Sequence, residues 1–269
     1  TSSEATDPFI ITGNVVWSGV KYVTGSVWIV ENATLTITEG TQVLFSDNKG
    51  MVVDGTLVVQ GTSSNRVLFN ASNSQWSGFR FSQLGKLSNI DSSGSYISGS
   101  LIRHAALTQI ATAHLTAGIV VDVKLGSIFI DSISATMQKP CIFSVSSVHV
   151  KDSVLQCTNY GVYSRSTVEP SVVHNNTITA NTYTIQLTQA NITDNTLISS
   201  RGVYVRNSGR IHLRRNNIQS TSATITASNF EELLVEDNIL SNPHWQGMDI
   251  LVRSASKYLS VTGNKFVNS

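Results

Sequence analysis

Charged residues are scarce in this chain, and it has no long apolar segment. Asp, Glu, Lys and Arg make up 13% of its 269 residues, and the formal net charge is +1. This balance gives no overall attraction to nucleic acid or to an anionic membrane, so we expect neither as a partner. No apolar run approaches the roughly 18 residues that a membrane-spanning helix needs, so we expect no direct membrane insertion.

Cysteine is nearly missing as well. The chain has two, Cys141 and Cys157. Two interpretations stay open at this point: a disulfide, which would fit an oxidising compartment, or a pair of buried thiols.

Asparagine, in contrast, recurs in a fixed phrase: an apolar residue, two polar residues, Asn, any residue, and another apolar residue. An earlier copy of the phrase has Ser153 in the Asn position. The copies follow one another at a period of about 22 residues, and such a period with short alternating strands indicates a solenoid. The Asn positions are Asn176, Asn195, Asn216, Asn238 and Asn264.

Each copy predicts a short strand that ends in a tight bend. Apolar residues three and five positions before the Asn, such as Leu213 and Ile211, give one strand a buried face. Asn tolerates left-handed backbone angles, and its amide both donates and accepts, so we expect stacked Asn side chains to pair from coil to coil as an asparagine ladder. Hairpin-connected β-sandwiches give no reason for one such bend per period.

The predicted fold is therefore all-β, a single-stranded right-handed parallel β-helix with about 22 residues per coil and roughly a dozen coils. Residues 1–8 form a linker-like lead, and residues 9–269 form one domain. We expect a fragment of a longer multidomain protein, because a solenoid needs a cap and none is visible after the last repeat. Strands are expected at Ile102, Leu107, 119–121, 128–130 and 142–143, but the register between about 82 and 146 stays open.

Catalytic groups of the polysaccharide-degrading kind do not gather in this pattern. Hydrolysis of a glycan needs a carboxylic acid and a second carboxylate close together. Asp152, Asp194 and Asp237 occupy the position before the ladder residue but are separated by intervening coils, and Asp is itself favoured at bends. We therefore expect a non-catalytic protein, with a polysaccharide lyase or glycoside hydrolase as the alternative.

Histidines give no metal site either. His149, Lys151 and His174 point outward by strand parity, and the sequence offers no third ligand of the kind that a zinc site needs. We expect a solvated face here, and no metal or cofactor.

One stretch is biased toward basic residues. Residues 195–230 contain five Arg and no acid, and Arg and Tyr are enriched at recognition surfaces. The same charges also protect a long sheet from aggregation. Trp245, in a longer connection, is either exposed for binding or folded back on the core. The candidate binding residues are Tyr204, Arg206, Arg210, His212, Arg214 and Trp245.

Four Asn-X-Ser/Thr sequons permit an extracellular location without demonstrating it. Asn191 is expected to be the most accessible, because it lies between two inward-facing residues. The candidate glycosylation sites are Asn32, Asn70, Asn175 and Asn191.

The N-terminal half carries a family resemblance. Residues 22–45, 55–62 and the Trp-x-Gly phrase of residues 75–81 resemble the first coils of pectin-lyase-like β-helix repeat proteins. They look most like the β-helix segments of bark beetle (Anakonda) proteins of tricellular junctions. This resemblance implies an extracellular structural or adhesion module that spaces or presents binding surfaces, with a protein partner or self-association at the cell surface. The alternative is a carbohydrate-active or glycan-binding β-helix protein, with a glycan as its partner.

Overall fold

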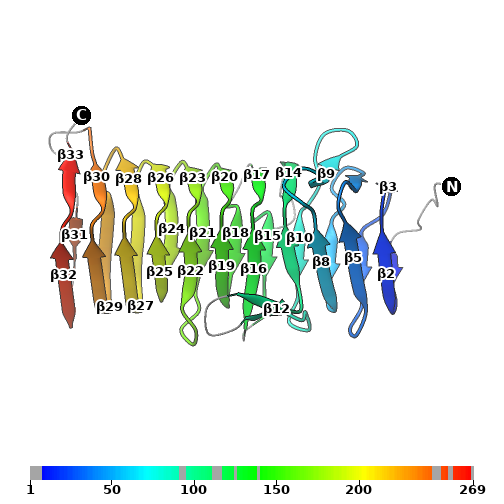
Figure 1. Cartoon of the computed structure of the whole chain (residues 1–269), viewed down its shortest axis with the longest axis horizontal. Helices are drawn as coiled ribbons and strands as arrows, with labels where there is room; N and C mark the ends of the chain where they lie inside the picture. Colours follow the sequence, from blue (N-terminus) through cyan, green and yellow to red (C-terminus); the bar gives the residue numbers. More distant parts are fainter. Residues whose placement is uncertain are drawn as a thin grey trace.

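The chain winds into a solenoid whose coils stack side by side along one axis (Figure 1). The computed structural model describes residues 8–90, 95–110, 117–123, 126–137, 140–243, 250–253 and 257–267. Within them, each coil contributes one segment to each of three walls, here named C, A and B in chain order, and the strands of each wall pair in parallel from coil to coil. This confirms the predicted parallel β-helix, with 11 coils in the described residues where roughly a dozen were expected.

Wall A contains β2 (Asn14–Trp17), β5 (Thr34–Thr38), β8 (Thr56–Gln60), β13 (Leu101–Arg103), β16 (Ser127–Asp131), β19 (Ser147–Lys151), β22 (Ser171–His174), β25 (Ala190–Thr193), the second halves of β27 (Val203–Arg214) and β29 (Ile225–Glu236), and β32 (Tyr258–Thr262). Wall B contains β3 (Val20–Val23), β6 (Gln42–Phe45), β9 (Val67–Ala71), β14 (Ala105–Ile110), β17 (Ser134–Met137), β20 (Val154–Cys157), β23 (Thr177–Ala180), β26 (Thr196–Ser199), β28 (Asn217–Ser220), β30 (Ile239–Ser241) and β33 (Lys265–Val267). Wall C contains β1 (Phe9–Ile11), β4 (Val27–Ile29), β7 (Met51–Val53), β10 (Phe79–Phe81), β15 (Ile119–Val121), β18 (Ile142–Ser144), β21 (Tyr160–Ser164), β24 (Tyr183–Leu187), the first halves of β27 and β29, and β31 (Ile250–Val252).

The core is a narrow channel filled by the inward-facing side chains of the three walls. One column of wall A shows the principle, because register places an apolar residue at the same height in successive coils. Complete burial of each such side chain contributes about 1.5–3 kcal/mol, so the stack is held mainly by these columns. The fully buried members of this column are Val59, Ile102, Ile130, Val150, Val173, Ile192, Leu213 and Val235.

Aromatic side chains fill the channel in the N-terminal half. The Trp76 ring stacks on Phe45 at 4.7 Å and meets Phe79 edge-on at 5.2 Å, and its indole Nε1 donates to the Thr108 carbonyl. Gly78 follows with φ +82°, and a Cβ there would come within 2.1 Å of a backbone carbonyl. The Trp-x-Gly phrase thus supplies a large core residue and a bend that only glycine fits.

The Asn residues of the repeat form a continuous ladder, buried from Asn176 to Asn238 and half-buried at Asn264. The Oδ1 of Asn195 accepts from both the backbone amide and the Nδ2 of Asn176, and the Oδ1 of Asn216 accepts in the same way from Asn195. The Asn216 Nδ2 donates further to the Ile192 carbonyl. Each amide therefore satisfies backbone groups that the bend leaves without a strand partner.

The left-handed backbone of the bend lies one residue earlier than expected. The positive φ angles belong to the residues before the ladder position, whereas the ladder Asn residues are not among the left-handed ones. Asn is selected there for its two-sided amide, and the preceding position favours Asp, Asn or Gly because these tolerate positive φ. The left-handed residues are Asp152, Asn175, Asp194, Arg215, Asp237 and Gly263.

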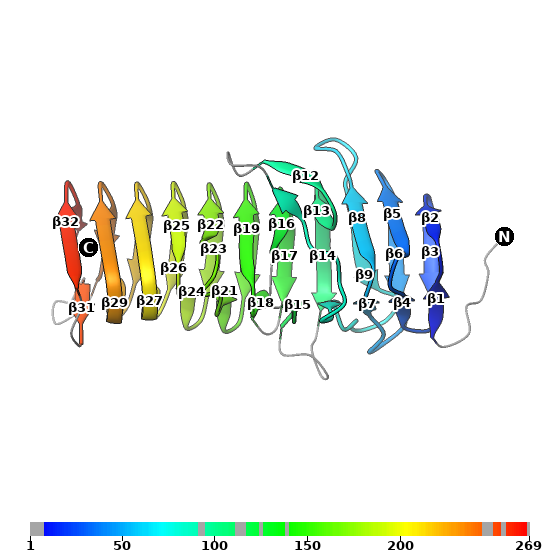
Figure 2. The ribbon, with the colours of Figure 1, turned by 90° about the horizontal axis from the view of Figure 1, so that it is seen from below.

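One insertion interrupts the regular winding. Val58 of β8 pairs with Leu101 of β13, so this coil is about twice the usual length. The extra chain includes the antiparallel hairpin β11 (Asn89–Ile90) and β12 (Tyr96–Ser98), which lies outside the stack (Figure 2). This insertion explains why the register between residues 82 and 146 could not be assigned from the repeat.

Candidate functional site

An open pocket of about 880 Å³ lies on the outer face of wall A. Strands β16, β19, β22 and β25 supply its floor, while Ser88 and Asn89 close one side and Glu169 and Pro170 close another. These side walls come from the hairpin insertion, whose strand β12 crosses the lower part of wall A in Figure 1, and from the long connection between β21 and β22. The outer wall is therefore not smooth at this point.

The hairpin changes the environment of an outward-facing aromatic residue. Phe129 points away from the core by strand parity, yet it is 1% exposed. Tyr96 of the hairpin lies against its ring at 5.9 Å, and Ser88 Oγ accepts from its backbone amide. Lys151 Nζ lies 5.3 Å from the same ring and 4.0 Å from Asp131 Oδ2. Phe129 thus anchors the hairpin and fixes the end of the pocket.

The pocket floor and rim offer hydrogen-bonding groups of both kinds. His174 Nδ1 lies 2.9 Å from Thr193 Oγ1. On the rim, the exposed Glu169 carboxylate accepts from Ser127 Oγ at 3.3 Å and Ser147 Oγ at 3.4 Å. Such a mixture suits a polar, uncharged or weakly charged ligand, because each donor or acceptor can be matched by a ligand group.

His149 lies inside this pocket rather than on the solvated face expected from the sequence. Its ring centroid is 6.4 Å from that of Phe129, with an interplanar angle of 27°. Burial lowers the pKa of His149 below its ordinary value of 6.5, and the nearby Glu169 carboxylate opposes this effect. The imidazole is therefore neutral at pH 7, and it can both donate and accept a hydrogen bond.

The lowered pKa of His149 predicts a pH effect on stability. Below pH 6.5 the unfolded chain takes up a proton that the folded histidine resists, so stability is greatest above 6.5 and decreases as the pH falls toward the folded pKa. We expect His149→Gln to flatten this dependence. Urea unfolding of both proteins at about pH 5.5 and about pH 7.5 measures it. If the free energy of unfolding changes equally with pH in the two proteins, His149 is not a buried neutral histidine.

The candidate basic patch is divided by the corner of the solenoid. Strand β27 belongs to wall C in its first half and to wall A in its second half, so Tyr204 and Arg206 face away from Arg210, His212 and Arg214. The three residues on wall A are also paired with acids one coil later, at 3.2, 3.0 and 3.7 Å. These partners are Glu232, Glu236 and Asp237, so the described second half of β27 presents no free basic patch.

The bend residues of neighbouring coils also pair on the surface. Arg215 makes two hydrogen bonds to the Asp194 carboxylate, both at 2.7 Å. The hydrogen bond from Arg215 lowers the pKa of Asp194. Asp152 accepts from the Asn175 amide at 2.7 Å. The acids that a catalytic interpretation would need are thus engaged in coil-to-coil contacts.

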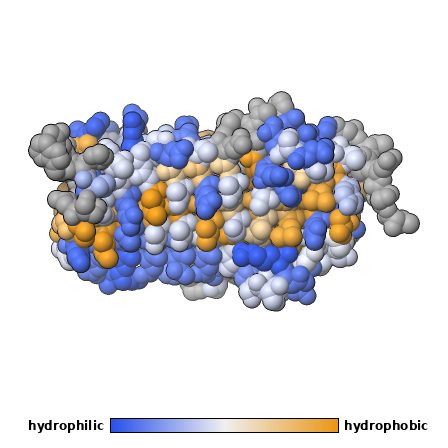
Figure 3. Space-filling model, turned by 90° about the horizontal axis from the view of Figure 1, so that it is seen from above, coloured by the Kyte–Doolittle hydropathy of each residue, from blue (hydrophilic) through white to orange (hydrophobic). Residues whose placement is uncertain are grey.

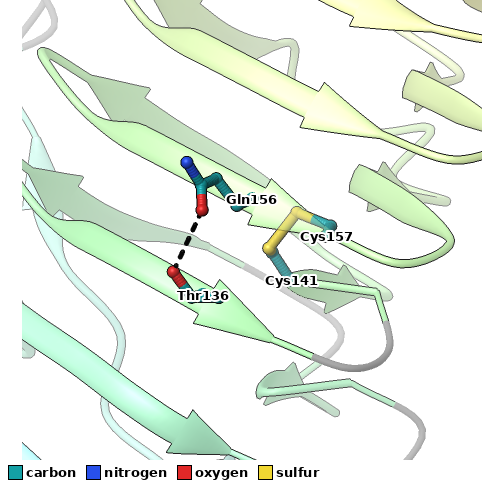
Figure 4. Close-up of a disulfide and its surroundings, with 4 residues drawn as sticks. All are labelled: Thr136, Cys141, Gln156 and Cys157. Atoms are coloured by element: carbon teal, nitrogen blue, oxygen red, sulfur yellow. Dashed lines mark hydrogen bonds between the residues drawn. A yellow bond between two sulfur atoms is a disulfide. The ribbon is translucent and has the colours of Figure 1, made fainter.

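The structure joins Cys141 and Cys157 in a disulfide (Figure 4). Cys141 immediately precedes β18 in wall C, and Cys157 ends β20 in wall B, so the two cysteines lie at the two ends of one coil. The bond therefore joins the start and the end of this coil at the corner between walls B and C, where the Cys141 backbone amide also donates to the Tyr160 carbonyl.

The sequon asparagines differ in their surroundings. Asn191 is exposed and lines the wall A pocket. Asn32 accepts from Lys86 Nζ, and Asn175 donates to Asp152. Asn70 is half-buried. Glycosylation at these positions stays a prediction. Trp245 lies outside the described residues.

No metal centre forms within the part of the chain that the structure describes. No three His, Cys, Asp or Glu side chains there come together in a way that could hold an ion. Both cysteines are bonded to each other, and Met51 and Met137 are buried in the core. His149 and His174 line one pocket but have no third nitrogen or sulfur ligand beside them among its described residues.

The pocket could not be inferred from the repeat pattern, because its side walls are departures from that pattern. One signal was available: Phe129 is a large aromatic residue at an outward position, which indicates that something covers it. A second was Glu169-Pro170, in a connection that makes its coil longer than the coils on either side. In the described residues no helix has the length and hydropathy of a membrane span.

Comparison with known proteins gives one family. The sequence profile of the family described as "Periplasmic copper-binding protein (NosD)" matches residues 83–269. No curated protein matches, and no solved structure matches. The family has a pectin-lyase-like parallel β-helix fold and lies outside the cytoplasm, as expected, while no comparison points to tricellular junction proteins. Because the match covers well over half of its residues, the chain belongs to the NosD family.

Proposed function

We propose that this chain is a non-catalytic β-helix module that works outside the cytoplasm as a rigid rod. It spaces or presents binding surfaces within a larger structural or adhesive protein, and its contacts are with a protein partner or a second copy of itself. The parallel stack supports this role, because an apolar core and an amide ladder that run through consecutive coils resist bending.

One observation carries the non-catalytic part of the proposal. Among the described residues that line the wall A pocket, Glu169 is the single carboxylate. Glycoside hydrolysis by the usual route needs two carboxyl groups about 5–9.5 Å apart across the scissile bond. The pocket can hold a polar ligand, but its described lining does not supply the paired acid and base that would cleave a glycan by that route.

The family's description as copper-binding is not matched by a donor set in the described residues. Copper is held by His, Cys and Met ligands, and here the cysteines form a disulfide while two histidines share one pocket without a third ligand. The proposed role therefore assigns no bound copper to this part of the chain.

A degradation assay tests the proposal. The protein is incubated with polygalacturonate and with alginate, and the release of reducing ends and of unsaturated uronate is followed. We expect no product above the level of a heat-unfolded sample. Turnover that disappears in His149→Gln would overturn the proposal.

One observation favours a second candidate, a polysaccharide lyase. His149 is neutral at pH 7 and lies in the same pocket as the cationic Lys151. A neutral base beside a positive charge is suited to removing a proton next to a carboxylate and stabilising the charge that develops. The assay described above decides between the two, because a lyase gives unsaturated product and a presenting rod gives none.

A further inference from the structure

A row of aromatic side chains follows the outer face of wall C across four coils. We name Phe143, Tyr160, Tyr163, Tyr183 and Tyr204 the aromatic stripe. Phe143 stacks on Tyr163 at 5.2 Å, Tyr160 on Tyr183 at 5.8 Å, and Tyr183 on Tyr204 at 5.0 Å, with interplanar angles of 12–18°. All five are half-buried, so their rings partly cover one another's faces, and the Tyr163 hydroxyl accepts from Arg165 Nε.

Positive charge accompanies the aromatic stripe. Arg165 lies over the rings of Tyr163 and Phe143, and Arg201 lies over Tyr183. The wall C segments of these coils, residues 141–146, 160–166, 181–189 and 200–206, contain three Arg and no Asp, Glu or Lys. None of the three arginines forms an ion pair with a described residue, in contrast to the paired arginines of wall A. The positive charge along the stripe is therefore not neutralised by a described acid.

The dimensions of the stripe distinguish between kinds of partner. Four coils about 4.8 Å apart and a strand of about four residues give roughly 250 Å² of surface. A stable protein interface buries about 800 Å² on each partner. The stripe is too narrow for a protein of globular shape. A long, thin polymer that lies along the axis fits it better.

The spacing and chemistry of the stripe select the polymer. One coil corresponds to about 4.8 Å, which is close to the length of one pyranose residue in an extended glycan, so successive sugars meet equivalent positions. Tyr hydroxyl groups can bond to sugar hydroxyls, and an Arg guanidinium forms paired hydrogen bonds to a carboxylate. We propose that the aromatic stripe binds an extended uronate polysaccharide, with Arg165 and Arg201 on its carboxylates.

Apolar side chains also gather in a band along the rod on the face in Figure 3, so its outer surface is not uniformly polar.

This inference goes beyond the proposed function, and its site lies on a different wall from the pocket. Calorimetric titration with a decagalacturonate tests it, with the methyl-esterified decamer as the uncharged counterpart. We expect binding that weakens with salt, and at least tenfold weaker binding of the ester. Arg165→Gln/Arg201→Gln should weaken binding at least tenfold, and Tyr183→Leu should also weaken it. The matched control is Arg210→Gln/Arg214→Gln, whose arginines are already paired on wall A; it should bind as the unaltered protein does.

Other ligands and one pocket variant make the test decisive. Dextran sulfate and poly-glutamate should bind more weakly than the uronate decamer. Equal or tighter binding of either one would overturn the inference, as would no binding of the decamer or unchanged binding by Arg165→Gln/Arg201→Gln. If His149→Gln abolishes binding while the arginine variant does not, the glycan lies in the wall A pocket and the inference is wrong. Thermal unfolding of each variant confirms that it is folded.

Discussion

Replacing Asn216 with leucine is expected to lower the free energy of unfolding by about 3–5 kcal/mol, because buried groups on two coils lose their partners. The Asn195 backbone amide and the Asn195 Nδ2 both donate to Asn216 Oδ1, and the Ile192 carbonyl accepts from Asn216 Nδ2. Leucine has a similar size but offers none of these bonds. Urea unfolding followed by far-UV circular dichroism measures the loss.

The adjacent residue supplies the control for this experiment. Asn217 lies on the outer face of wall B and takes no part in the ladder. Asn217→Leu should change stability by less than about 0.5 kcal/mol, as surface substitutions usually do. Equal losses for the two variants would mean that the amide ladder contributes nothing beyond what any asparagine does.

Asn216→Asp separates the donor role of the amide from its acceptor role. The carboxylate still accepts from Asn195, but it cannot donate to Ile192, and it faces the Asn238 oxygen in a buried position. The buried site should raise the carboxyl pKa above its unfolded value of about 3.9. Stability is then highest below that value and falls as the pH rises through the folded pKa. This variant should therefore lose more stability at neutral pH than in acid.

Removal of the disulfide gives the second large effect. Cys141→Ser/Cys157→Ser should lower stability by about 3 kcal/mol, because the bond closes a loop of about 15 residues in the unfolded chain. Dithiothreitol should lower the melting temperature of the unaltered protein by a similar effect and leave the double variant unchanged. If the reductant has no effect, and mass spectrometry finds two free thiols before its addition, the bond does not form in solution.

The C-terminal half of the fold could be predicted in detail because its repeats are nearly uniform. Asn176 through Asn264 occur once per coil, and the coil-to-coil register places them at equivalent positions. The local geometry was less predictable. The left-handed angle belongs to the preceding residue, as at Asp237, because the Asn side chain must point inward to reach the next amide.

The surface features were harder to predict, because they depend on contacts between coils. The Arg-rich stretch from 195 to 230 suggested a basic patch, but the acids that neutralise Arg210 and Arg214 lie one coil further along the chain. The same long strand turns a corner, which puts Tyr204 on wall C and His212 on wall A. Neither effect can be seen in a short stretch of the sequence, but both can be found when the coil length is known and residues one coil apart are compared.

The Asn amides of the ladder point the same way along the axis, since in each Asn-to-Asn pair the Nδ2 of the earlier coil donates to the Oδ1 of the later coil. Their dipoles add, so the two ends of the row are chemically distinct. Two such rods that met end to end could continue the row only head to tail, and a two-fold symmetric junction would bring like ends together. A rod of this construction has a direction along its axis, so contacts between its ends favour open head-to-tail assemblies over closed two-fold symmetric dimers.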